Sequence, residues 1–107
     1  MRFKVVIAEE IYAVEVPDEL LPEAEAFHAK LDRDMDRGWQ MSREFVDRPD
    51  SLQRCQIVAD RLLTSIMQNN QATAMLMAGY IALRVPGVVG VDIDTSGEMQ
   101  HTRLLYA

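Results

Sequence analysis

The sequence reads QNNQATAMLMAGYIAL over residues 68–83, and this stretch decides the fold. It contains no charged side chain, and neither do the six residues before it, so a helix over residues 72–83 is apolar all round. Such a helix must be covered on every side, either inside a core or against another chain. Met67, Met75 and Met77, three of the seven methionines, give this region a soft and adaptable surface. The stretch therefore predicts a central core helix or a subunit interface.

The helical register of this stretch continues upstream to residue 51. One unbroken helix over residues 51–84 would be about 50 Å long, whereas a compact chain of this length has a radius of gyration of about 13 Å. We therefore expect a break at residues 68–71, because Asn disfavours helix interiors. Asp50 and Gln53 have the spacing of a capping box at the start. Pro86 is expected to stop the helix at Val85.

Strand-like alternation marks both ends of the chain. Residues 3–7 and 11–16 form two short alternating runs, with Glu9 and Glu10 as a tight connection between them. Residues 89–93 and 99–106 predict a second pair of strands, joined by a turn at residues 95–98. The pattern predicts an α+β fold with an N-terminal β-hairpin, two to three helices and a C-terminal β-hairpin. We expect an antiparallel sheet with the helices on one face, in a single domain over residues 1–107.

A further helix is expected between the first hairpin and residue 50. It begins near Pro22, carries an apolar stripe of residues at three- and four-residue spacing, and ends at Gly38. Residues 39–49 have no clean period and predict a connection tucked against the core. The run VPGVVGVD, residues 85–92, resembles the helix-to-strand junction of ferredoxin-like domains such as the heavy-metal-associated and small-molecule-sensing domains. The Cys pair of the heavy-metal-associated domains is absent and the order of elements differs, so the resemblance implies a tight turn and no function.

The charge of the chain is unevenly distributed. Residues 1–36 contain ten acids and four bases, whereas residues 37–107 contain seven of each, so the formal net charge of -6 lies in the N-terminal third. Nucleic acid and anionic membranes are poor partners for such a chain, because both require a basic face. A basic protein surface is a compatible partner, although an acidic face also serves solubility alone. A single Cys, Cys55, and no signal-like segment predict a cytoplasmic protein.

Few residues have the spacing of a chemical site. Glu25, His28 and Asp32 lie at i, i+3 and i+7 and form a weak candidate metal site, against the alternative of a half-buried histidine. Asp92-x-Asp94-x-Ser96-Gly97 begins like a calcium loop but has Arg103 at the position that requires Glu. The chain has no recognisable nucleophile, phosphate-loop or dinucleotide motif, so no catalytic residue and no cofactor are predicted, and enzymatic activity is left unsupported.

The sequence thus predicts a small accessory or regulatory protein that acts through protein–protein association, as a homodimer in the first instance. The residues expected at its interface lie on or beside the apolar stretch: Met67, Met75, Met77, Gly79 and Tyr80. The alternative is a small-molecule- or metal-binding protein, or a minor enzyme, with a pocket between helices and sheet. Its pocket candidates are Met41, Asp92 and His101.

Overall fold

A computed structural model describes residues 1–19 and 22–107. Strands β1 (Arg2–Ile7) and β2 (Glu10–Glu15) form the N-terminal hairpin, with Ile7 opposite Glu10. The turn between them is Ala8-Glu9, one residue earlier than predicted, and both residues have positive φ (49° and 70°). Positive φ at both central positions is the type I′ geometry, whose twist matches that of the flanking strands. This turn normally takes Asn-Gly, so Ala8 and Glu9 occupy it under strain.

Relieving that strain should stabilise the hairpin. A non-glycine residue in the left-handed region costs about 1 kcal/mol, so Ala8→Asn combined with Glu9→Gly should raise the free energy of unfolding by about 1–2 kcal/mol. Thermal unfolding monitored by circular dichroism checks this. The same Asn-Gly pair placed at Asp47-Arg48, where neither φ is positive, is the matched control and should give no gain. An equal gain at both places would contradict the turn geometry.

The hairpins at the two ends of the chain form one four-stranded sheet. The strand order is β2-β1-β5-β6, where β5 is Val88–Ile93 and β6 is Arg103–Tyr106. Both hairpins are antiparallel, as predicted, but β1 and β5 are parallel, with Lys4 beside Gly90 and Ile7 beside Ile93. The sheet is therefore mixed rather than fully antiparallel. An alternating pattern shows which side chains face the core but does not show the relative direction of two distant strands.

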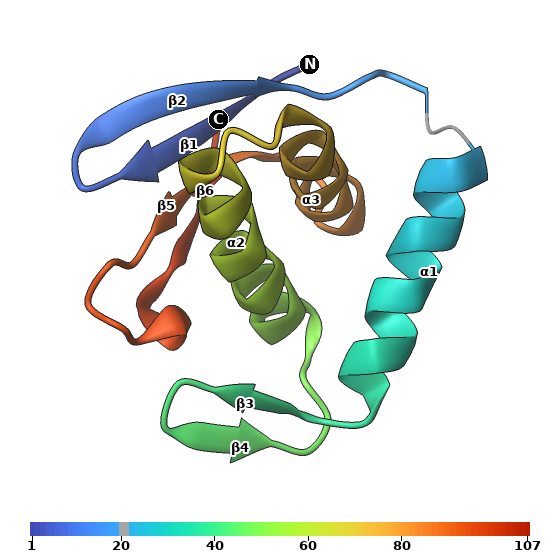
Figure 1. The fold of residues 1–107 in the computed structure, drawn as a ribbon, viewed down its shortest axis with the longest axis vertical. Helices are drawn as coiled ribbons and strands as arrows, with labels where there is room; N and C mark the ends of the chain where they lie inside the picture. Colours follow the sequence, from blue (N-terminus) through green and yellow to red (C-terminus); the bar gives the residue numbers. More distant parts are fainter. Residues whose placement is uncertain (20–21) are drawn as a thin grey trace.

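Three helices lie on one side of this sheet, two of them packed against it, which confirms the predicted α+β class. They are α1 (Pro22–Asp36), α2 (Ser51–Met67) and α3 (Gln71–Arg84). Figure 1 shows α2 and α3 between the sheet and α1, so α1 is the helix farthest from the sheet. The predicted break between α2 and α3 is confirmed: Asn69 has φ 55°, and the Asn70 side chain accepts a hydrogen bond from the Thr73 backbone at 3.1 Å. The predicted capping box at Asp50 and Gln53 is also present.

Two segments differ from the prediction. Residues 39–49 contain a small hairpin of strands β3 (Trp39–Met41) and β4 (Glu44–Val46), where only a connection was expected. Strands of three residues are too short for their alternation to be recognised. Residues 99–101 form the 3₁₀ helix η1 (Met99–His101), so the last strand begins later than expected. The Asp94 side chain accepts hydrogen bonds from the Ser96 and Glu98 backbones, which folds the chain into a compact turn before η1.

The core lies between the sheet and the pair α2–α3. Its centre is apolar and fully buried, with Phe3, Val5, Val58, Leu62 and Ile81 at 0% exposure. The apolar helix α3 is largely covered within one chain, but Ala72, Met75 and Leu83 on it remain exposed.

Cys55 is buried, and burial raises the pKa of its thiol to about 11. Among the described residues, no helix combines the length and apolar character needed to cross a bilayer.

Candidate functional site

Two of the three residues predicted to bind a metal, His28 and Asp32, are engaged in other contacts. Glu25 is exposed on α1, whereas His28 is 1% exposed, and its Nε2 lies 2.8 Å from the Leu76 carbonyl oxygen. This pairing makes Nε2 the donor and leaves Nδ1 as a buried acceptor with no partner among the described residues. Burial lowers the pKa of His28, so the ring is neutral near pH 7. Within residues 1–19 and 22–107, no three His, Cys, Asp or Glu side chains are arranged to hold a metal ion.

Asp32, the third of these residues, is the centre of a polar cluster that joins α1 to the other two helices. The Tyr80 hydroxyl donates to its Oδ1 at 2.5 Å, Arg84 donates to Oδ2 at 2.7 Å, and Arg54 donates to Oδ1 at 3.2 Å. The Arg84 guanidinium also lies over the Tyr80 ring, 4.6 Å from its centroid. Burial raises the pKa of Asp32, but these hydrogen bonds outweigh it and keep the pKa below its ordinary value. The cluster is a permanent ionic link between elements rather than a free acid or base.

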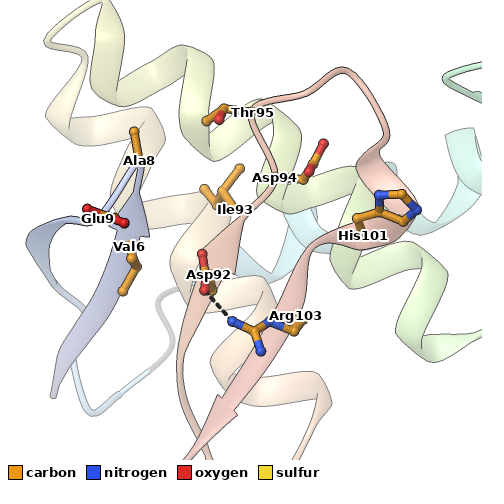
Figure 2. A pocket seen from close by; sticks show the side chains of 9 residues that line it. All are labelled: Val6, Ala8, Glu9, Asp92, Ile93, Asp94, Thr95, His101 and Arg103. Atoms are coloured by element: carbon orange, nitrogen blue, oxygen red, sulfur yellow. Dashed lines mark hydrogen bonds and ion pairs between the residues drawn. The ribbon is translucent and has the colours of Figure 1, made fainter.

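Two of the three predicted pocket residues, Asp92 and His101, line an open hollow of about 340 Å³ where β1 and β5 end. Figure 2 shows that its polar groups come from separate segments, with Glu9 on one side and Asp94 and His101 on the other. Arg103 donates to Asp92 at 2.7 Å, and Asp94 is held by the backbone of its own loop. Asp92 and Asp94 are thus already engaged. Met41, the third predicted pocket residue, lies elsewhere and is buried in the core at 1% exposure.

A second hollow follows the open edge of the sheet, and we call it the β2 groove. Its volume is about 440 Å³, and β2 forms one wall. The other wall is the end of α2, the connecting loop and the start of α3. The lining residues are Tyr12, Ala13, Val14, Glu15, Ser65, Ile66, Asn69, Asn70, Gln71, Ala74 and Met75. The groove therefore combines an apolar floor with polar amides along one side.

The backbone of β2 presents unpaired hydrogen-bonding groups along this edge. The Val16 N–H donates to the Met1 carbonyl at 2.8 Å, so the even-numbered residues of β2 direct their backbone groups to β1. The backbone N–H and C=O of Ile11, Ala13 and Glu15 then point away from β1. Because β2 is the terminal strand of the sheet, no described strand pairs with them. An edge of this kind is a template for a further strand.

A third hollow, which we call the α1–α3 pocket, lies where β2 runs on into the chain before α1. It has a volume of about 120 Å³ and an almost wholly apolar lining. The residues that line it are Val16, Pro17, Glu19, Glu23, Ala24, His28, Met75, Leu76, Gly79 and Leu83. Met75 borders both this pocket and the β2 groove, so the two hollows adjoin.

Gly79 lines the α1–α3 pocket from the interior of α3. A Cβ added there would meet Val16 Cγ1 at 3.6 Å and His28 Cε1 at 3.7 Å, which are ordinary van der Waals contacts. Glycine in a helix interior costs about 1 kcal/mol relative to alanine. The packing of the described residues therefore does not require glycine at this position, and its absent side chain leaves space in the pocket.

The residues predicted at an interface divide into two sets. Met67 and Met75 are exposed, at 56% and 36%, whereas Met77 and Tyr80 are buried in the core of the same chain. Gly79 is also buried but lines the α1–α3 pocket. The open edge of β2 was not foreseen, because the order of strands in a sheet cannot be deduced from their alternation. Comparison of the chain with protein-family models, with curated proteins and with solved structures gives no match.

Proposed function

We propose that this protein is a protein-binding module that takes an extended segment of a partner along β2 as a fifth strand. The observation that carries the proposal is the open edge of β2 beside the β2 groove. In strand addition, main-chain hydrogen bonds provide affinity, and hollows beside the edge select side chains. The groove offers both, because Ala13 and Glu15 present free backbone groups along it and Ile66 and Ala74 line its other wall.

The charge of this edge favours a basic partner. β2 begins at Glu10 and ends at Glu15, both exposed, and Glu9 precedes it in the turn. Pairing of β2 with β2 of a second copy would bring the Glu10 end of each strand beside the Glu15 end of the other, and like charges across strands are destabilising. A segment that carries Lys or Arg beside its apolar positions would instead place positive charges opposite these glutamates, which is favourable. The proposed partner is therefore an extended segment with alternating apolar residues and flanking basic residues.

Selection of peptides provides the test. A library of random peptides somewhat longer than β2 is selected on the purified full chain, and binding is measured by calorimetry. We expect enriched peptides with alternating apolar residues and at least one Lys or Arg. Ala13→Pro should weaken their binding by at least about tenfold, because it removes an edge N–H and blocks pairing.

The fold should tolerate this substitution, since the Ala13 N–H is not used in the pairing with β1. Ala13→Val is the matched control: it retains the N–H, suits a strand and should leave binding nearly unchanged. Circular dichroism confirms that both variants are folded. Equal binding to the wild type and to Ala13→Pro would contradict strand addition.

Self-association through exposed apolar side chains of α2 and α3 is a second candidate. The observation in its favour is the exposure of Met67, Met75 and Leu83, at 56%, 36% and 50%. Isolated apolar side chains are common on surfaces, but neighbouring ones mark association sites. Light scattering at micromolar concentration measures this directly: a dimer supports the candidate, and a strict monomer excludes it.

A further inference from the structure

We infer that the α1–α3 pocket is an anchor site for one aliphatic or aromatic side chain of the partner segment that pairs with β2. This inference rests on the proposed function and adds a specificity-determining position to it. The inference is based on three features of the pocket: Gly79 in its wall, its apolar lining, and its position at the end of the β2 groove.

The pocket has the size and chemistry for a single apolar group. A cavity of about 150 Å³ lined by apolar side chains holds benzene, so a volume of about 120 Å³ suits a branched aliphatic group or a small ring. Ala24, Leu76 and Leu83 supply carbon surface. The lining also contains the His28 ring, and its Nε2 is already paired with the Leu76 carbonyl oxygen. Because this ring is neutral, the charged groups of the lining are the exposed Glu19 and Glu23.

Gly79 is the observation that indicates an occupant from outside. An alanine there would meet its described neighbours at ordinary contact distances and would favour the helix. The glycine therefore keeps space in the pocket at the expense of helix stability. Stability given up with no packing reason among the described residues is a mark of a functional position.

The path of the chain connects this pocket to the proposed strand site. β2 continues through Val16 and Pro17, which line the pocket, and Met75 separates the pocket from the β2 groove. If a partner segment pairs along β2 and continues beyond Glu15, its next residues reach the α1–α3 pocket. Glu19 and Glu23 line the same pocket and are exposed. They favour a basic residue beside the apolar anchor, which agrees with the acidic edge of β2.

Gly79→Ala tests the inference because it should change stability and binding in opposite directions. The added methyl occupies part of the pocket, so the selected peptides should bind at least about fivefold more weakly. The same methyl improves the helix, so the melting temperature should rise by about 5 °C. Gly97→Ala adds a methyl where nothing lies within 4 Å, and it is the control that should not affect binding.

Benzene probes the pocket independently of β2. In spectra of the labelled full chain we expect saturable shifts of the Ala24, Leu76 and Leu83 signals in the wild type and in Ala13→Pro, and weaker binding in Gly79→Ala. Peptide binding that is lost in Ala13→Pro but unchanged in Gly79→Ala, without benzene binding, overturns the anchor site and leaves the proposed function standing. Peptides that bind all variants equally overturn the proposed function and, with it, the partner segment as the occupant.

Discussion

Replacing Asp32 by Asn is expected to lower the free energy of unfolding by about 3 kcal/mol. The carboxylate accepts hydrogen bonds from Tyr80, Arg54 and Arg84, each on a helix other than its own. An amide cannot accept all of them, and it leaves the Arg84 guanidinium without its counter-ion, whereas Arg54 keeps an ion pair with Asp36 at 2.6 Å. Because few other contacts hold α1 against α3, we expect this loss to loosen α1 from the rest of the fold.

Urea unfolding of the two proteins measures this effect. The control is Asp34→Asn, which removes an exposed i,i+4 pair with Lys30 on the same helix. Exposed pairs of this kind contribute about 0.3–0.5 kcal/mol, so the control should be almost silent. Equal losses in Asp32→Asn and Asp34→Asn would contradict the role assigned to the cluster.

The pH dependence of stability follows from the same contacts. The pKa of Asp32 is lower in the folded chain than in the unfolded chain. Its contribution is therefore fully present above about pH 5 and is lost as the pH falls through the folded pKa. Acid unfolding of Asp32→Asn should accordingly show a shallower loss of stability below about pH 4 than the wild type.

Gly90→Ala is the second substitution with a large expected effect. A Cβ at this position would collide with the Lys4 carbonyl oxygen, which belongs to the backbone of the neighbouring parallel strand. Neither strand can move without disturbing the centre of the sheet. We expect a loss of about 3 kcal/mol or a chain that does not fold.

Gly97→Ala is the matched control for this substitution. Gly97 has φ +94° but nothing within 4 Å, so only backbone strain opposes a side chain. That strain costs about 1 kcal/mol. A loss at Gly90 no larger than the loss at Gly97 would contradict the close parallel pairing of β1 with β5.

The elements of the fold could be predicted where local chemistry determines them. The capping box at Asp50, the break at Asn69 and Asn70, and the stop at Val85 each depend on neighbours within four residues. The parallel pairing of β1 with β5 could not be predicted, because it depends on the path of three helices between the two strands. Strands β3 and β4 are too short for a periodic signal.

The candidate site was only partly accessible from the sequence. The acidic charge of residues 1–36 was compatible with a basic partner surface or with solubility alone, and the apolar stretch contains Met75 and Gly79, which line the hollows described above. The open edge of β2 depends on which strand is last in the sheet, and neighbours far along the chain decide this. Asp32 has the spacing of a metal ligand, but its partners Tyr80 and Arg84 lie 48 and 52 residues away, where no local pattern reveals them.

Hydrogen exchange of the β2 amides tests the central claim most directly. In the free chain the N–H groups of Ile11, Ala13 and Glu15 point away from β1 and should exchange rapidly, whereas those of Tyr12 and Val14 should be protected. With a selected peptide at saturation, we predict that exchange at the three outward positions slows by at least about tenfold. Unchanged exchange at Ile11, Ala13 and Glu15 with the peptide bound would contradict strand addition at this edge.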